Sequence, residues 1–199
     1  IILDSEPGFD DAVAIVSALF DPRLEVLAIT ATAGTVTAEQ ATSNVAAIVS
    51  MLDPPRYPRI GKATPPEDAS ASDDKFLNGK SGLGEMIVAH TQRHHLPTSE
   101  KVICELIRQH PDQVTLVCLG PLTNLARICR RDPKALTQID KIVISGGAVG
   151  IAGNATPVAE FNLHFDPIAA SEVFSSPTTK SLVPLNVTRQ VTFGLELLE

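Results

Sequence analysis

The chain has 199 residues, 44% of them hydrophobic and 20% charged, which is enough to bury one core, so we expect a single domain over residues 1–199. The formal charge of −7 provides no basic stripe for a nucleic-acid backbone. No apolar run approaches the roughly 20 residues that a membrane span needs. Composition therefore excludes nucleic-acid binding and membrane-spanning classes.

Three cysteines bear on the compartment. Cys104, Cys118 and Cys129 are odd in number, and their spacing fits neither a disulfide framework nor a zinc site. The N-terminal residues lack the pattern of a secretory signal. Reduced thiols are typical of the cytoplasm, so we expect a cytoplasmic protein.

Short apolar runs rich in β-branched residues alternate with helical patterns along the chain. Strands are predicted at Ile1–Leu3, Val26–Thr32, Val114–Leu119, Lys141–Ile144 and Ser181–Pro184. Helices are predicted at Asp10–Leu19, Ala38–Met51, Ser99–Gln109, Leu122–Arg131 and Pro167–Ser175. This alternation predicts an α/β fold with an open, mostly parallel sheet and helices on both faces. The stretch Pro54–Gly84 has little periodicity and predicts a long loop.

The loop after the first predicted strand is unusually acidic. It holds Asp4, Glu6, Asp10 and Asp11, whose like charges repel one another. A cation, or a ligand rich in hydroxyl groups, would relieve that repulsion. Ligands of open α/β sheets bind outside the carboxyl ends of the strands, which is where this loop lies. Oxygen ligands alone favour a hard cation such as Ca²⁺ or Mg²⁺.

Asp10 and Asp11 fall in the first turn of the predicted helix. The simplest structural interpretation makes Asp10 the N-cap, but a cap needs one acid and the loop has four. Neighbouring helical residues point about 100° apart, so these two side chains cannot face one ligand atom. One could bind a metal ion while the other binds a group beside it.

Two mechanisms could use such a loop. In one, a carboxylate and a metal ion activate a water molecule that attacks an electrophilic carbon. In the other, Asp4 is the nucleophile of a metal-dependent phosphatase. That second mechanism ranks lower because the later lysine and acid motif of such phosphatases are not evident in the sequence.

The sequence resembles the inosine–uridine preferring nucleoside hydrolase family. Residues Asp4–Asp11 match the family's loop Asp-x-Asp-Pro-Gly-x-Asp-Asp, with Glu6 at the second acid. Further family motifs occur, in order, at Leu119–Ala126, Gly146–Ala148, Gly153–Asn162, Asp166–Pro167 and Pro184–Thr188. The resemblance therefore covers nearly the whole chain and implies a nucleoside hydrolase-like fold with a Rossmann-like core.

The resemblance implies cleavage of the N-glycosidic bond of a ribonucleoside by a water molecule that Ca²⁺ activates. It implies that Glu6 is both the catalytic base and a metal ligand, together with Asp11 and the carbonyl of Leu119. It assigns ribose binding to Asp10, Asn154, Glu160 and Asn162. For Glu160 and Asn162, a structural network of loop hydrogen bonds is the alternative.

The resemblance also implies a biological setting. The substrate would be a small-molecule ribonucleoside, the role purine and pyrimidine salvage, and the assembly a homo-oligomer, either a dimer or a tetramer. Family members continue beyond the position of Glu199, with a stretch that supplies a further Asp ligand and a His. We therefore expect the C-terminal portion of the family fold to be absent from this chain.

Four positions depart from the family pattern. Glu6 replaces an Asp, Thr35 stands where an Asn is usual, Asn78 where many members have a His, and Ser145 replaces a Met. Displacing a catalytic carboxylate by about 1 Å can cost on the order of a hundredfold in rate. A rival interpretation is therefore a catalytically impaired homologue that keeps the ribose-binding residues.

Overall fold

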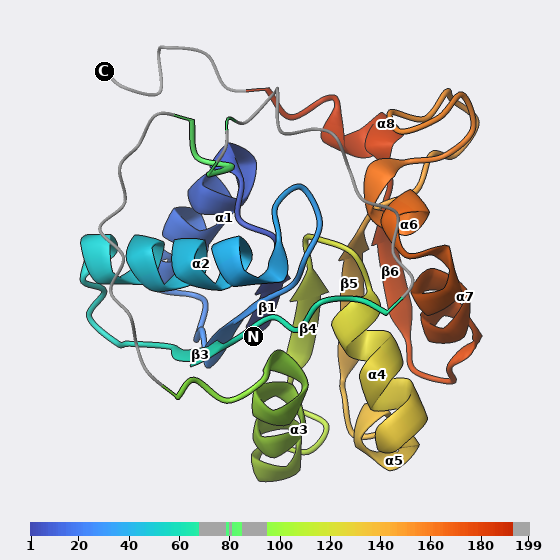
Figure 1. The fold of residues 1–199 in the computed structure, drawn as a ribbon. Helices are drawn as coiled ribbons and strands as arrows, with labels where there is room; N and C mark the ends of the chain where they lie inside the picture. The colour runs from blue at the N-terminus through green and yellow to red at the C-terminus, as the bar shows by residue number, and fades with distance from the viewer. Residues whose placement is uncertain (68–78, 80, 85–94, 193–199) are drawn as a thin grey trace.

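The computed structural model describes residues 1–67, 79, 81–84 and 95–192 (Figure 1). Asn78 and part of the predicted Pro54–Gly84 loop lie outside these residues. The described strands form one six-stranded sheet in the order β3-β2-β1-β4-β5-β6, and every neighbouring pair is parallel. The strands are β1 (Ile2–Ser5), β2 (Ala28–Ala31), β3 (Arg59–Gly61), β4 (Thr115–Cys118), β5 (Lys141–Ser145) and β6 (Lys180–Val183).

Helices cover both faces of this sheet. Ile2 of β1 belongs to one hydrophobic core, whereas the next residue, Leu3, belongs to the core on the opposite face. The core around Ile2 includes residues of α3, α4, α5 and α7, and the core around Leu3 includes residues of α1 and α2. The helices are α1 (Phe9–Phe20), α2 (Ala38–Leu52), α3 (Ser99–Gln109), α4 (Thr123–Arg131), α5 (Pro133–Leu136), α6 (Phe161–Phe165), α7 (Pro167–Ser175) and α8 (Leu185–Thr188).

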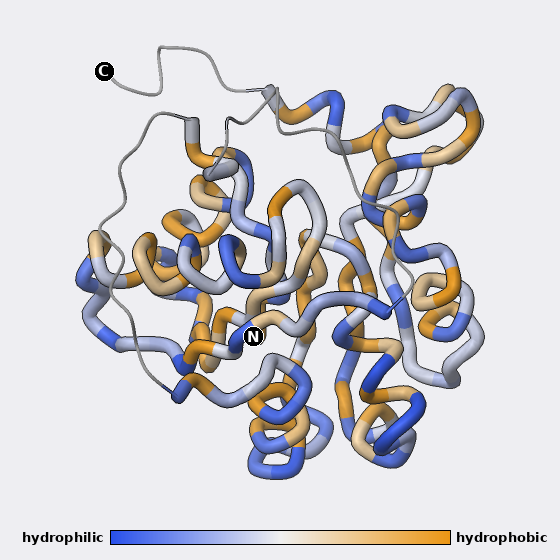
Figure 2. Tube along the Cα trace, in the orientation of Figure 1, coloured by the Kyte–Doolittle hydropathy of each residue, from blue (hydrophilic) through white to orange (hydrophobic). Residues whose placement is uncertain are grey.

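Hydropathy follows this layered arrangement. Orange, hydrophobic segments run along the strands between the helices (Figure 2). Such continuous apolar strands are expected where a parallel sheet is buried on both faces. The predicted α/β fold is confirmed. None of the helices within the described residues is long and apolar enough to cross a membrane.

Most predicted elements are confirmed within a few residues, and the bounds of α3 and α7 agree with the prediction. The interpretation of Pro54–Gly84 as loop throughout is wrong, because β3 lies inside it. Three residues are too few for a periodic signal, and β3 forms because its backbone pairs with β2, Ala28 opposite Arg59. The short helices α5, α6 and α8 were likewise not predicted.

The order of the strands creates the place for a site. From β1 the chain proceeds to β2 on one side, whereas from β4 it proceeds to β5 on the other. Loops that leave the carboxyl ends of β1 and β4 therefore diverge and leave a crevice between them. The Leu119 N–H donates to the Asp4 carbonyl at 2.8 Å, which fixes the two loops side by side.

Candidate active site

The acidic loop turns tightly between β1 and α1. The helix α1 begins at Phe9, with Gly8 as its N-cap. The carboxylate of Asp11 reaches back and accepts a hydrogen bond from the Gly8 N–H at 3.2 Å. The interpretation of Asp10 as the N-cap is therefore wrong, because the helix begins one residue before it. Asp10 is exposed and Asp11 is buried, so the two carboxylates diverge.

Asp4 is the most deeply buried acid of this corner, at 1% exposure. Its Oδ1 accepts hydrogen bonds from the Thr30 hydroxyl at 2.6 Å and from the Asn124 amide at 2.9 Å. Its Oδ2 has no partner among the described residues. Burial raises the pKa of Asp4 to about 7, although both hydrogen bonds oppose that rise. Because the side chain is enclosed, it has no access to a phosphoryl group, which argues against the phosphatase mechanism.

Glu6 is also buried, at 5% exposure. In residues 1–67, 79, 81–84 and 95–192, the Thr35 N–H is the only donor to its carboxylate, and it bonds to Oε2. Burial, followed by the charge of Asp11, holds the pKa of Glu6 well above its ordinary value. The remaining oxygen, Oε1, is left for a ligand or a water molecule.

Asp11 completes a group of three buried carboxylates. Burial raises its pKa to about 7, the negative charge of Asp10 adds to the rise, and the hydrogen bond from Gly8 opposes it. Asp4, Glu6 and Asp11 thus share a corner in which each is easier to protonate than in water. A positive charge placed beside them would favour their ionised forms.

The donor chemistry of this corner fits a hard cation. Glu6 and Asp11 offer carboxylate oxygens, and Leu119 offers a carbonyl from the adjacent loop. Within the described ranges, no group of three or more His, Cys, Asp or Glu side chains is arranged closely enough to hold a metal ion. Hydrogen bonds from Gly8, Thr35 and Asn162 each take one acceptor site on Asp11, Glu6 and Leu119. The corner therefore has suitable ligands for a metal ion, and Oε1 of Glu6 can bind it while Oε2 keeps its bond to Thr35.

Glu160 and Asn162 join the loops on the other side of the crevice. Glu160 is the N-cap of α6, and its carboxylate accepts from the N–H groups of Asn162 at 3.0 Å, Leu163 at 3.3 Å and Gly147 at 2.9 Å. The Asn162 amide donates to the carbonyl of Leu119 at 2.8 Å and to that of Ser145 at 3.0 Å. These bonds are the structural network considered as the alternative, and they shape the edge of the crevice.

Asn154 differs from these two residues in its exposure. It lies at the surface, and its Oδ1 accepts a hydrogen bond from the Phe161 N–H at 2.8 Å. That bond brings it to the start of α6, next to Glu160. Of the residues predicted to bind ribose, Asp10 and Asn154 are therefore exposed, whereas Glu160 and Asn162 are buried.

Two asparagines support the acidic corner; Asn124 lies in the predicted motif Leu119–Ala126 but its contact with Asp4 was not predicted, and Asn44 was not predicted at all. Asn124 donates to Asp4 and, at 2.9 Å, to the Ala31 carbonyl. Asn44 donates to the carbonyls of Pro7 at 3.0 Å and Ser81 at 2.7 Å. Asn44 could have been found from the sequence, because it is a polar residue among the buried apolar positions of α2. A buried amide in such a place requires polar partners.

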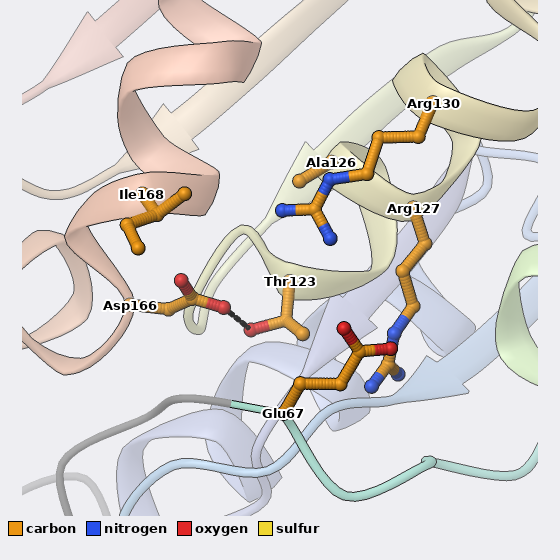
Figure 3. Close-up of a pocket in the computed structure, with 7 residues that line it drawn as sticks. All are labelled: Glu67, Thr123, Ala126, Arg127, Arg130, Asp166 and Ile168. Carbon is orange, nitrogen blue, oxygen red and sulfur yellow. Dashed lines mark hydrogen bonds between the residues drawn. The ribbon is translucent and has the colours of Figure 1, made fainter.

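A separate small hollow lies beside α4 and α7 (Figure 3). In its lining, the Thr123 hydroxyl donates to Asp166 at 2.7 Å. Arg127, also in the lining, forms an ion pair at 3.1 Å with the buried Glu100, which lies outside the lining. None of the predicted site residues lines it; the lining residues are Glu67, Thr123, Ala126, Arg127, Arg130, Asp166 and Ile168. Both arginines in its lining are paired, Arg127 with Glu100 and Arg130 with Glu172, so we place the candidate site at the acidic corner.

The sequence matches a family model described as inosine-uridine preferring nucleoside hydrolase over residues 1–199. It is 35% identical over 201 residues to "Probable uridine nucleosidase 1" of Oryza sativa subsp. japonica, covering 97% of this chain and 60% of that protein. It is 39% identical over 191 residues to "Pyrimidine-specific ribonucleoside hydrolase RihA" of Salmonella paratyphi A, covering 96% and 61%. The chain thus spans about three fifths of the length of these relatives.

Solved structures agree with these matches. A plant nucleoside hydrolase superposes with a TM-score of 0.90 at 31% identity, covering 98% of this chain and 62% of the other. A purine-preferring ribonucleoside hydrolase from Gardnerella vaginalis gives the same TM-score at 30% identity, covering 98% and 63%. This chain is therefore about as similar to the purine-preferring hydrolase as to the plant nucleoside hydrolase.

Proposed function

The chain belongs to the inosine-uridine preferring nucleoside hydrolase family, and we propose that the full-length protein hydrolyses ribonucleosides to a free base and ribose. The observation that carries this proposal is the group of three buried carboxylates, Asp4, Glu6 and Asp11, at the carboxyl end of β1. The related proteins are named for uridine, for pyrimidines and for purines. Nucleosides with these different bases share the ribosyl group. We therefore propose that the acidic corner binds the ribose, whichever base it carries.

Ribose recognition is proposed for Asp10, Asn154, Glu160 and Asn162. Asp10 presents an exposed carboxylate that can accept hydrogen bonds from a sugar diol. A carboxylate has about four lone-pair sites, and backbone N–H groups occupy three of those on Glu160. The Oδ1 of Asn162 and the NH₂ group of Asn154 remain free of the hydrogen bonds described above for those side chains. Each residue therefore retains hydrogen-bonding capacity for a hydroxyl group.

A divalent metal ion, which we propose to be Ca²⁺, would be held by the carboxylates of Glu6 and Asp11 and by the carbonyl of Leu119. When bound, it would supply positive charge that acidifies a water molecule and favours the ionised carboxylates. The protein's own residues supply the rest of the chemistry. The Thr35 N–H holds Glu6 through Oε2, which supports a role for Oε1 in contact with the reactants.

In the proposed reaction, Glu6 accepts a proton from water. The water oxygen forms a bond to the anomeric carbon of the ribose, and the bond from that carbon to the base nitrogen breaks. The electron pair of the broken bond leaves with the base, which takes up a proton. A base positioned in this way contributes typically about 10²- to 10⁴-fold to such a rate.

The setting of this activity is also a proposal. Release of free bases from nucleosides fits a role in purine and pyrimidine salvage, in a homo-oligomer. Among the described residues, Cys104, Cys118 and Cys129 are free thiols, which supports a reducing, cytoplasmic compartment.

Product analysis tests the proposed function. The protein encoded by the complete gene would be incubated with inosine or uridine, with Ca²⁺ and after chelation, and free ribose and base quantified. We expect equal amounts of ribose and base with Ca²⁺ and loss of both after chelation. Binding of nucleoside without release of ribose would contradict the proposal and would favour the catalytically impaired homologue.

A further inference from the structure

Glu6 leans towards the loop that follows β2. Its Oε2 accepts the Thr35 N–H, and the residue before Thr35 is Gly34. A Cβ atom added to Gly34 would overlap Oε2 and Cδ of Glu6 and would lie 3.1 Å from Oε1. The three nearest atoms are thus all from the carboxyl group. That group lies in the space that any other residue at position 34 would fill.

The backbone of Gly34 does not itself require glycine. Its φ angle is not among the positive values, which within the described residues belong to Gly79, Gly82, Gly84, Gly147 and Gly150. Alanine could therefore adopt the same backbone conformation without strain. The need for glycine at position 34 comes from the Glu6 carboxylate.

Gly120 limits Glu6 from the opposite loop. A Cβ atom there would lie 2.9 Å from Cγ of Glu6 and 2.8 Å from Cγ2 of Thr32. The stem of Glu6 therefore packs against the β4 loop, while its carboxyl group lies against the β2 loop. The extra methylene of glutamate, relative to aspartate, is accommodated sideways between two glycines.

We propose that Gly34 is a positioning residue, which fixes the Glu6 carboxylate on the Thr35 N–H and so allows glutamate to act as the base at this position. The inference rests on the proposed function, since it assigns to Gly34 an effect on the base of that reaction. Added bulk at position 34 would push the carboxyl group off Thr35. The displaced atoms are the end of a flexible side chain, so the backbone can keep its place.

The test is a cycle of Gly34→Ala, Glu6→Asp and the double variant, assayed for ribose release with Ca²⁺ in the protein that the complete gene encodes. Gly34→Ala should lower kcat about a hundredfold with little change in KM, because the base is displaced and the ribose contacts remain. Aspartate is one methylene shorter and withdraws from the added methyl group. Glu6→Asp in the Gly34→Ala background should therefore raise kcat by about tenfold or more.

A matched variant separates side-chain length from charge in thermal unfolding. Glu6→Gln keeps the length of glutamate, so the decrease in Tm caused by Gly34→Ala should be as large in the Glu6→Gln background as in the unmodified protein. The inference is overturned if Gly34→Ala keeps the kcat of the unmodified protein. It is equally overturned if the double variant with aspartate is no more active than Gly34→Ala alone.

Thermal unfolding tests the contact between Gly34 and Glu6 without an activity assay. If Gly34 and Glu6 share one space, the decrease in Tm caused by Gly34→Ala should be smaller in the Glu6→Asp background. Additive changes in Tm would overturn the inference. Absence of ribose release from the unmodified protein would instead overturn the proposed function, and the unfolding cycle would still decide whether Gly34 sets the position of Glu6.

Discussion

Two buried glutamates on opposite sides of the crevice have nearly equal exposure and very different partners. Glu6 is 5% exposed and Glu160 is 7% exposed. Glu160 accepts three backbone N–H groups, whereas Glu6 accepts one from the described residues. The charges of Asp11 and Asp10 repel that of Glu6, so repulsion adds to incomplete hydrogen bonding. Burial alone therefore does not mark a reactive acid; the deficit of donors does.

The largest effect should come from removing the charge of Glu6. Glu6→Gln keeps the shape of the side chain and removes its ability to accept a proton from water. We expect kcat for ribose release to fall about 10²- to 10⁴-fold. A matched control is Glu105→Gln on α3, whose carboxylate pairs with Arg59 at the surface. An equal loss in both variants would contradict the special role of the acidic corner.

The division of labour between Asp10 and Asp11 can be tested by Ca²⁺ titration. Asp11→Ala should abolish Ca²⁺ binding, because it removes a buried carboxylate from the proposed metal ligands. Asp10→Ala should leave Ca²⁺ binding largely intact and weaken binding of ribose, since its carboxylate is exposed and diverges from Asp11. Calorimetry with Ca²⁺ and with ribose separates the two. Equal loss of Ca²⁺ binding in both variants would contradict this division.

The pH dependence of the free energy of unfolding tests, without any substrate, whether Asp11 is destabilised as an ionised carboxylate in the acidic corner. The pKa of Asp11 is raised to about 7, so between about pH 4 and pH 7 the folded state keeps a proton that the unfolded state releases. The stability that protonated Asp11 contributes to the metal-free protein is therefore lost as the pH rises through this window.

Asp11→Asn removes this titration and keeps an oxygen that can accept the Gly8 N–H. Its free energy of unfolding relative to the unmodified protein should increase from pH 4 to pH 7 by on the order of a few kcal/mol. Saturating Ca²⁺ should reverse the difference, because the ion stabilises only the protein that binds it. Urea titrations at several pH values measure this, and a difference that is independent of pH would contradict it.

The sequence was enough to predict the parallel sheet and the place of the acidic corner, because both depend on local patterns. Pro7-Gly8 and four acids identify the corner, and apolar runs identify five of the strands. The contact of Gly34 with Glu6 could not be predicted, since it joins residues from two loops. Thr35 acts through its N–H, so its departure from the family's Asn gives no indication of this bond. β3 was missed because pairing with β2, and not its own three residues, determines it.

The smallest effect should follow from altering Glu160, whose carboxylate accepts three backbone N–H groups. Glu160→Gln replaces one carboxylate oxygen by an NH₂ group, which cannot accept the N–H groups that the oxygen accepted.

The free energy of unfolding should fall by about 1–3 kcal/mol, the cost of leaving a buried donor without a partner. Glu172→Gln on α7 is the matched control: its pair with Arg130 is partly exposed, and its loss should cost no more than about 1 kcal/mol. If Glu160→Gln instead left stability unchanged and abolished ribose binding, Glu160 would be a substrate ligand first and a helix cap second. The contrast with Glu6 would then lie in the ligand that each acid binds, and not in the number of its backbone donors.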